Sequence, residues 1–341
     1  MSGGFQSVLA GWDGQAVAVR HDLPTGAWMF VALHDDTMGP PVGGIRMRVY
    51  ERPEDGLVDA TRLAAGMTYK WAAMELPFGG GKSVLAVPRV MEGEERAGLL
   101  VRFAGLLDSL NGGYRGGGDL GTTPADMALL SRHTAYIMGG LGEEAFDPGP
   151  FTALGVLCGI ESAANVVFGT RELSGRSILV QGVGDVGRPL ARLLAEKGAT
   201  LMLADVDCAT VESVAAECGG TIVEPGSVYV TSCDVYAPCA LGATLNPQTI
   251  PGLDCRIVAG SANNQLFRPA DGVALHERGI LYTPDYVVNG GGAMAGGLIH
   301  LGVADVEELN RRVAGIGRAL DRSSPTPNET ASPPAKRPID G

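Results

Sequence analysis

The stretch from residue 177 to residue 205 constrains the fold more than any other part of this 341-residue chain. It contains, in order, an apolar strand, a glycine loop, a helix and a second strand that ends in an aspartate. The segments are S-I-L-V-Q (177–181), G-V-G-D-V-G (182–187), R-P-L-A-R-L-L-A-E-K (188–197) and T-L-M-L-A (200–204), followed by Asp205. This order of elements predicts a βαβ unit with parallel strands and places the chain in the α/β class.

The glycine spacing in this loop has a chemical reason. Gly182 allows a tight turn, Gly184 lets the backbone approach a pyrophosphate, and Gly187 lets the helix pack closely on the strand. The free N–H groups at the helix N-terminus favour phosphate. Asp205 can accept a hydrogen bond from a ribose 2′-hydroxyl and would repel a 2′-phosphate, so the unit predicts NAD rather than NADP. The loop residues expected to contact the cofactor are Gly182, Val183, Gly184, Asp185, Val186 and Gly187.

A glycine turn in an unrelated α/β unit is the alternative explanation, and the complete strand–loop–helix–strand–acid context argues against it. Three further strands are predicted downstream, at 221–223, 234–236 and 256–259. Two of these strands lead into small or polar residues. Because ligands of open α/β sheets bind beyond the carboxyl ends of the strands, we expect a nicotinamide–ribose pocket there. Its candidate edges are Ala237, Pro238 and Asn263.

The rest of the chain also alternates between strand and helix patterns. Strands are predicted at 27–34, 45–50, 83–87 and 281–288, and helices at about 53–73, 93–110, 124–131, 152–167 and 304–321. A Gly-Pro pair at 149–150 marks a boundary. We therefore expect three regions: a substrate-binding and catalytic α/β domain at 1–148 with a return of about 290–321, a dinucleotide-binding (Rossmann) domain at 149–289, and a disordered Pro-rich tail at 322–341.

The charge and cysteine content exclude some functions. The formal net charge is −12 and the pI is near 4.9, which argues against a nucleic-acid or anionic-membrane partner, because both need basic patches. None of the six cysteines forms a C-x-x-C pair, so we expect reduced thiols and no metal site. We find no signal-peptide pattern and no run that approaches ~20 apolar residues, and we expect a cytoplasmic chain without a membrane span.

Two lysines in the segment 66–82 attract attention because they stand among apolar residues and glycines. Lys70 closes a predicted helix, and Lys82 follows three glycines. Lysines whose stems snorkel along the surface are the simpler interpretation. However, a lysine buried near another lysine has a lowered pKa and can act as a base near neutral pH. With Asp119, which lies in a second glycine-rich segment at 111–123, the set suits the oxidation of an amine.

The chain resembles the leucine/phenylalanine/valine branch of the Glu/Leu/Phe/Val amino-acid dehydrogenase family. The motifs that carry the resemblance, in family order, are V-G-G-I-R-M (42–47), G-M-T-Y-K (66–70), L-P-F-G-G-G-K (76–82), D-L-G-T (119–122), T-A-L-G-V from Thr152, Q-G-V-G-D-V-G (181–187) and P-D-Y-V-V-N-G-G-G (284–292). The resemblance implies two α/β domains with the active site in the cleft between them. It also implies a homo-oligomer and the reversible conversion of an L-amino acid, NAD and water to a 2-oxo acid, ammonia and NADH.

The resemblance also implies a role for each matching residue. Lys70 would hold the substrate α-carboxylate, Lys82 would activate water, and Asp119 would be the acid/base carboxylate. The backbone of Gly43 and Gly44 would lie beside the substrate and the nicotinamide. The remaining implied contacts are Met67 and Asn289 with the substrate and Thr152 with the cofactor.

Substrate choice depends on four positions that line the side-chain pocket in leucine enzymes. Here they are Val42, Gly117, Ala293 and Gly296, each as small as or smaller than the family residue. No charge stands at these positions, so a glutamate substrate is disfavoured. The missing wall atoms indicate a bulky apolar substrate that is phenylalanine-like rather than valine-like. The alternative is that neighbouring side chains refill the pocket.

Two other interpretations stay open. The chain could be a leucine or valine dehydrogenase proper, or a non-catalytic NAD-binding paralogue. The second is suggested by the C-terminal region, where A-M-A-G-G-L-I-H (293–300) departs from the family pattern and the last family helices are replaced by the Pro/Ser-rich tail. This departure puts domain closure and oligomer geometry in doubt.

Overall fold

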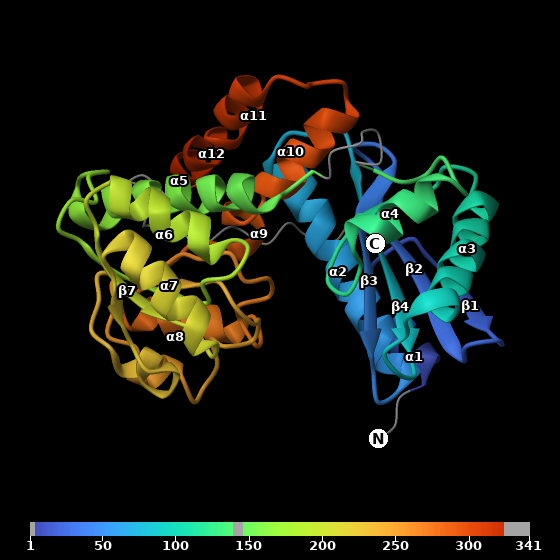
Figure 1. Ribbon diagram of the computed structural model, residues 1–341, viewed down its shortest axis with the longest axis horizontal. Coiled ribbons are helices and arrows are strands. Elements are labelled where there is room, and N and C mark those ends of the chain that lie inside the picture. The colour runs from blue at the N-terminus through green and yellow to red at the C-terminus, as the bar shows by residue number, and fades with distance from the viewer. Residues whose placement is uncertain (1–3, 139–145, 324–341) are drawn as a thin grey trace, which may run out of the picture.

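The computed structural model describes residues 4–138 and 146–323. Figure 1 shows two sheets in separate lobes, with the helix α5 (Gly149–Phe168) along the second lobe and α10 (Gly291–His300) reaching from it to the first. All six cysteines are free.

The first lobe is built on a five-stranded mixed sheet in the order β1-β2-β4-β3-β5. β1 and β2 pair antiparallel, as do β2 and β4, whereas β3 runs parallel to both β4 and β5. The strands are β1 (Ala16–Asp22), β2 (Ala27–Asp35), β3 (Pro41–Val49), β4 (Gly79–Val87) and β5 (Arg115–Gly118). All nine residues of the central strand β4 are buried, so this strand forms the core of the lobe.

Helices cover both faces of this sheet. The helix α2 (Pro53–Ala73) packs Leu57, Ala60 and Ala64 against β2 and β4, while α3 (Gly93–Ser109) packs against the opposite face. α2 begins with Pro at its first position and two acidic residues in its first turn, which suit the helix dipole. The short helices of this lobe are α1 (Phe5–Ala10) and α4 (Pro124–Ser131). A capping box between Thr123 and Asp126 caps the N-terminus of α4.

The second lobe contains a parallel six-stranded sheet in the order β8-β7-β6-β9-β10-β11. Numbered from the first strand of the lobe, this order is 3-2-1-4-5-6, the doubly wound dinucleotide-binding topology. The strands are β6 (Ser177–Gln181), β7 (Thr200–Ala204), β8 (Thr221–Ile222), β9 (Val235–Pro238), β10 (Ile257–Val258) and β11 (Leu281–Tyr282). The prediction of an α/β fold with a Rossmann unit is therefore confirmed.

Helices and 3₁₀ turns cover the faces of the parallel sheet and complete the second lobe. They are α6 (Gly187–Glu196), α7 (Cys208–Cys218), η1 (Pro225–Val230), η2 (Ile250–Gly252) and α8 (Ala270–Glu277). The apolar residues of α5 and α6 pack with those of β6, β7 and β9 in one core cluster.

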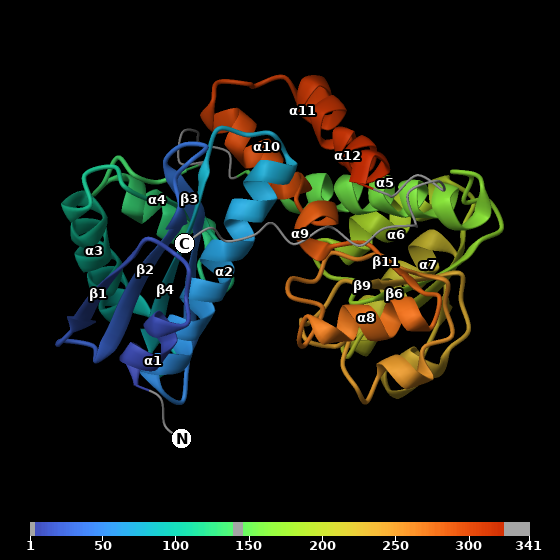
Figure 2. The ribbon, with the colours of Figure 1, turned by 180° about the vertical axis from the view of Figure 1, so that it is seen from behind.

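The C-terminal region is helical; Figure 2 shows from behind that α10 reaches the first lobe and that α11 and α12 then lead back to α5. It contains α9 (Asp285–Val288), α10, α11 (Val306–Val313) and α12 (Gly315–Ser323). α12 packs along α5, while α10 packs against both α5 and the connection between α2 and β4. A Cβ atom added at Gly297 would lie 3.0 Å from the ring of Phe78 and 3.4 Å from that of Trp71, so α10 touches the first lobe at its glycine face.

Three element predictions were wrong. The strand predicted at 281–288 ends at Tyr282, because Pro284 and Asp285 begin a short helix whose Tyr and Val residues have the composition of a strand. The single helix predicted at 304–321 is two helices, interrupted at Ala314. Residues 115–118, interpreted as a loop because of their glycines, form β5.

Two further differences concern the C-terminal part of the chain. The sequence indicated no helix at 291–300, although α10 forms there despite its glycines. The disordered tail predicted at 322–341 starts too early, since α12 reaches Ser323. The remainder of that predicted tail, 324–341, falls outside the described residues.

The helix α5 is long and apolar enough to cross a membrane by length and composition, in contrast to the expectation that no such run exists. Half of its most apolar window is buried within this chain. It packs against α6, α10 and α12, which explains its apolar composition as that of a core helix.

Gly80 provides a test of the packing between β4 and α2. A Cβ atom at this position would overlap the side-chain oxygen and backbone nitrogen of Thr68 and would lie 2.6 Å from the carbonyl oxygen of Ala64. Helix backbone cannot yield easily, so we expect Gly80→Ala to destabilise the protein by about 2–3 kcal/mol. Gly105→Ala on α3 is the control, because a Cβ there meets nothing within 4 Å. Equal melting temperatures of the two variants in thermal unfolding would contradict this packing.

Candidate active site

A buried ion pair lies at the centre of the first lobe. Lys82 Nζ is 3.0 Å from Asp119 Oδ2, and Lys82 is only 5% exposed. Arg46 donates from Nε to the same Asp119 oxygen, also at 3.0 Å. The two cations therefore share one carboxylate oxygen. The surface-lysine interpretation of Lys82 is excluded by this burial.

The strand register brings these groups together. β3 lies between β4 and β5, with Ile45 paired to Ser83 on one side and to Gly118 on the other. Lys82 and Asp119 are the sequence neighbours of those two partners, so both side chains reach the same point beside β3. β5, which the sequence did not indicate as a strand, is therefore the element that positions Asp119.

Gly43 and Gly44 permit this close approach. A Cβ atom at Gly43 would overlap the carbonyl group of Gly81 in β4. At Gly44 a Cβ atom would lie 2.8 Å from Lys82 Nζ and 2.6 Å from the Cβ atom of Asp119. The backbone of Gly44 thus stands directly beside the ion pair, where any side chain would displace it.

The environment shifts the pKa of each group in this pair. Burial lowers the pKa of Lys82, and the opposing effect of Asp119 does not restore it. Burial by itself raises the pKa of Asp119, but Lys82 and Arg46 together outweigh that effect and hold it below its usual value. Asp119 is thus ionised at neutral pH, and Lys82 gives up its proton more readily than a surface lysine.

Arg46 was missed by the sequence analysis as a functional residue. Its Nη1 donates to Asp59 Oδ2 at 2.9 Å, and Tyr50 donates its hydroxyl to the same oxygen at 2.6 Å. Arg46 thus connects Asp119 to a second carboxylate and fixes the orientation of both. The sequence feature that could have indicated Arg46 is an arginine within a predicted strand, two residues after the Gly43-Gly44 pair.

Two aromatic residues hold the Val42–Gly44 backbone and were also missed. Trp71 donates its indole N–H to the carbonyl of Val42 at 3.0 Å. The buried Tyr114 donates its hydroxyl to the carbonyl of Gly43 at 2.9 Å. Burial raises the pKa of Tyr114, so its hydroxyl remains a donor. Both residues lie beside features that the sequence indicated, since Trp71 follows Lys70 and Tyr114 belongs to the glycine-rich segment 111–123.

Lys70 lies in the last turn of α2 and is partly buried. Burial lowers its pKa to about 8, with Asp285 opposing the shift and Lys82 adding to it. Asp285 belongs to α9 and Lys82 to β4, so charged groups outside and inside the first lobe both shift the pKa of Lys70. Neighbouring residues also meet across this junction, where the rings of Tyr69 and Tyr286 lie 6.1 Å apart.

On the second lobe, Asn289 and Asn263 come together. Asn289 is buried and donates from its amide nitrogen to the Ser261 carbonyl at 3.1 Å and to Asn263 Oδ1 at 2.9 Å. Its amide oxygen is buried without a hydrogen-bond partner among the described residues. A buried acceptor without a partner is costly, which marks this oxygen as a candidate contact for a ligand donor.

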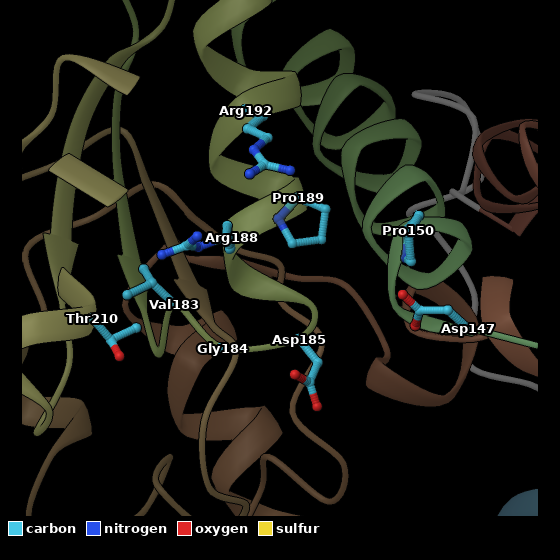
Figure 3. Close-up of a pocket in the computed structure, with 9 residues that line it drawn as sticks. All are labelled: Asp147, Pro150, Val183, Gly184, Asp185, Arg188, Pro189, Arg192 and Thr210. Carbon is cyan, nitrogen blue, oxygen red and sulfur yellow. The ribbon is translucent and has the colours of Figure 1, made fainter. Parts of the chain in front are cut away.

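The glycine loop has the geometry that a dinucleotide needs. Gly182 has a φ of +90°, and a Cβ at Gly187 would overlap the Gly182 carbonyl, so both positions require glycine. A Cβ at Gly184 would meet nothing within 4 Å. A cavity of about 460 Å³ beside this loop is lined by Val183, Gly184 and Asp185, by Arg188 and Arg192, and by Asp147 and Pro150 (Figure 3). The loop backbone and the two arginines suit a pyrophosphate group, whereas the two aspartates do not.

Asp205 holds the loop in place. One of its oxygens accepts from the backbone N–H of Val183 at 2.8 Å, and the other accepts from that of Asp207 at 3.0 Å. The carboxylate thus lies at the end of β7 beside the glycine loop, where the sequence placed the ribose. Lys70, Lys82 and Asp119 do not line the cavity of Figure 3, which belongs to the second lobe.

The other predicted cofactor contacts have mainly structural partners. Ala237 and Pro238 are buried within β9, and Ala237 belongs to the core of the parallel sheet. Thr152 donates its hydroxyl to the Pro148 carbonyl and accepts from the backbone N–H of Gly292 at 3.2 Å. Thr152 therefore ties the start of α5 to the start of α10.

The predicted side-chain pocket residues lie near one another. Val42, Met67 and Ala293 belong to one apolar cluster that also contains Trp71. Gly296 lies one turn after Ala293 on the same face of α10, and Gly117 lies in β5. Within residues 4–138 and 146–323, the structure brings together no group of three or more metal-ligating side chains.

Comparison with known proteins identifies relatives of both lobes. Residues 23–136 match the family model described as Glu/Leu/Phe/Val dehydrogenase, dimerisation domain, and residues 205–299 match that of Glutamate/Leucine/Phenylalanine/Valine dehydrogenase. A leucine dehydrogenase from Bacillus subtilis (strain 168) is 42% identical over 321 residues, which are 91% of this chain and 85% of the relative.

Two more relatives have other names. A phenylalanine dehydrogenase from Lysinibacillus sphaericus is 38% identical, over 82% of this chain and 74% of the relative. The crystal structure of an L-tryptophan dehydrogenase from Nostoc punctiforme superposes with a TM-score of 0.77 at 37% identity, covering 93% of this chain and 91% of that one.

Asp205 gives a direct test of the cofactor site. Asp205→Ala leaves the buried N–H of Val183 without an acceptor and removes the predicted acceptor for a ribose hydroxyl. We expect NADH affinity, measured by calorimetry, to fall about tenfold or more, since a hydrogen bond to a charged group contributes ~1.5–3 kcal/mol. Discrimination against NADPH should shrink.

Asp207→Ala is the matched control for this test. Asp207 caps α7 through the N–H groups of Ala209 and Thr210. Its loss should lower thermal stability and leave NADH affinity unchanged. A wild-type protein that binds NADPH more tightly than NADH would contradict the assignment of Asp205.

Proposed function

The chain belongs to the Glu/Leu/Phe/Val dehydrogenase family and is an amino-acid dehydrogenase, and we propose that it catalyses the reversible NAD-dependent oxidative deamination of an apolar L-amino acid. The products would be the 2-oxo acid, ammonia and NADH. The observation that carries the proposal is the buried Lys82–Asp119 pair at 3.0 Å beside Gly44, whose two charges both act on the pKa of Lys70.

Lys70 binds the substrate α-carboxylate in this proposal. A pKa of about 8 leaves it mainly charged at neutral pH, and an arriving carboxylate would favour the charged form further. The apolar surroundings that lower its pKa also strengthen its attraction for an anion, because a low local dielectric weakens screening.

Lys82 and Asp119 handle the protons. When bound, NAD would supply the acceptor for the hydride on the substrate Cα. The ionised Asp119 takes a proton from the substrate ammonium group, Lys82 in its neutral form takes a proton from the water that attacks the oxidised carbon, and Asp119 returns its proton to the departing amine. Arg46 is a positioning residue that keeps the Asp119 carboxylate in place through their 3.0 Å hydrogen bond.

Asn289 and Asn263 provide polar groups from the second lobe, whereas Lys70, Lys82 and Asp119 belong to the first lobe. The unpartnered amide oxygen of Asn289 can accept a hydrogen bond from the substrate ammonium group. Asn263, held by Asn289 at 2.9 Å, suits the nicotinamide ribose. A homo-oligomer is proposed because residues 23–136 match a dimerisation-domain model.

The substrate side chain is proposed to be bulky and aromatic, phenylalanine-like, because Gly117 and Gly296 remove wall atoms from the pocket. A leucine-like or valine-like substrate is the second candidate. It is favoured by the leucine dehydrogenase that is 42% identical over 91% of this chain.

A panel of L-Phe, L-Trp, L-Leu and L-Val tests the substrate class through the absorbance of NADH. We expect all four to react, with kcat/KM for L-Phe exceeding that for L-Val about tenfold or more, since each methylene is worth ~1–3 kcal/mol of discrimination. A preference for L-Val would overturn the proposal of a bulky substrate. Silence with every amino acid, while NADH still binds, would favour a non-catalytic NAD-binding protein.

Single substitutions separate the two lysines. Lys82→Ala should lower kcat by about 10²–10⁴-fold with little change in KM, because it removes a general base. Lys70→Ala should mainly raise KM, because it removes a carboxylate contact. Lys197→Ala is the control: this lysine is half exposed and pairs with Glu161 away from the glycine loop. The reverse pattern would mean that the two roles are exchanged.

The pH dependence of binding adds a check on Lys70. A 2-oxo acid is anionic throughout the neutral range, so its affinity should be full below pH 8 and should weaken as Lys70 loses its proton above about 8. Lys70→Arg should move this break to higher pH, because guanidinium stays charged.

A further inference from the structure

The two glycines of the predicted side-chain pocket each face a large apolar side chain from another part of the chain. A Cβ atom at Gly117 would lie 4.0 Å from the Cβ of Met138, and one at Gly296 would lie 3.4 Å from Cε1 of Phe146. These are ordinary van der Waals distances. The space that a larger residue at 117 or 296 would occupy is therefore bordered by Met138 and Phe146.

Met138 is fixed beside Gly117 by the backbone. Its N–H donates to the Gly116 carbonyl at 2.7 Å, while the N–H of Gly116 donates to the Tyr136 carbonyl at 2.9 Å. These bonds extend the sheet by one bridge, between Gly116 and Ile137. The side chain of Met138 is partly buried in the same apolar cluster as Val42 and Met67.

Phe146 is fixed beside Gly296 by aromatic packing. Its ring stacks on that of Phe151 with centroids 5.7 Å apart and an interplanar angle of 27°. Phe151 belongs to the first turn of α5, a helix of the second lobe. Phe146 is partly buried in the same cluster as Met138 and Ala293.

We propose that Phe146, supported by Met138, sets the size of the substrate side-chain pocket. This inference rests on the proposed function and deepens it. The glycines at 117 and 296 remove wall atoms, and the two side chains Met138 and Phe146 supply a wall beside them. The pocket accepts a bulky apolar side chain, and the ring of Phe146 limits how large that side chain can be.

Phe146→Ala should therefore open the pocket. We expect the ratio of kcat/KM for L-Trp to that for L-Phe to rise about tenfold, in line with ~1–3 kcal/mol for each methylene of misfit. Met138→Ala should raise the same ratio by a smaller factor. Phe146→Leu tests the proposal if the alanine variant folds poorly. An unchanged ratio, or a falling one caused by lost stacking on an aromatic substrate, would overturn the proposal.

A double-mutant cycle tests the contact between Phe146 and Gly296. Gly296→Val would place methyl groups against the Phe146 ring, so it should lower kcat/KM for L-Phe strongly in the wild-type background. In the Phe146→Ala background, Gly296→Val should reduce kcat/KM for L-Phe by a factor at least about five times smaller than in the wild-type background, because residues in contact couple by ~0.5–3 kcal/mol. Additive effects would contradict the proposed wall.

The control is Phe267→Ala, which removes a ring that is 60% exposed in the second lobe. It should leave every substrate ratio unchanged. Activity of the wild-type protein on the panel decides the proposed function independently of these ratios. A wild-type preference for L-Leu would refute the aromatic substrate, whereas an unchanged ratio of L-Trp to L-Phe in Phe146→Ala would refute the role of Phe146.

Discussion

The structure of the first lobe depends on burying Lys82. A buried ammonium is costly unless it is paired, and here it is paired with Asp119 at 3.0 Å. One carboxylate between two cations would leave an excess positive charge, and Asp59 balances it through Arg46. Two cations and two carboxylates thus form a neutral network in the core of a sheet. The low dielectric that makes this network expensive also lowers the pKa of Lys82, so the same burial that must be compensated prepares the residue to release a proton.

The network requires backbones that approach more closely than side chains allow. β3 passes between β4 and β5 with glycines at 43 and 44, and a Cβ at either position would overlap or crowd the neighbouring strands. Glycine strands are weak by propensity, and this chain supports them from outside. Trp71 and Tyr114 donate hydrogen bonds to the carbonyls of Val42 and Gly43, which fixes a backbone that has no side chains of its own to pack.

Features that depend on local periodicity could be predicted from the sequence. The helix at 53–73, the strands at 177–181 and 200–204 and the glycine loop between them follow from spacing and caps, and Lys82 and Asp119 follow from lysine and aspartate in glycine-rich surroundings. Tertiary packing decided the rest. β5 and α10 are glycine-rich and have low propensity for strand or helix. Both form because their backbones pack closely against neighbouring elements, β5 against β3 and α10 against α5 and the first lobe. Arg46 and Phe146 were missed because their meaning depends on partners 73 and 150 residues away, Asp119 and Gly296, a separation that no local pattern contains.

α10 explains how the two lobes are held to each other. Its glycines face α5 at Phe151 and Thr152 on one side, and Trp71 and Phe78 of the first lobe on the other. Thr152 accepts a hydrogen bond from Gly292, and Trp71 holds the carbonyl of Val42. The same helix therefore contacts the first turn of α5 and the indole that orders the Gly43–Gly44 backbone. Close glycine packing transmits small shifts because it leaves no side chain to absorb them. A displacement of α10 relative to α5 must then shift Trp71, and through Trp71 the backbone beside Lys82 and Asp119.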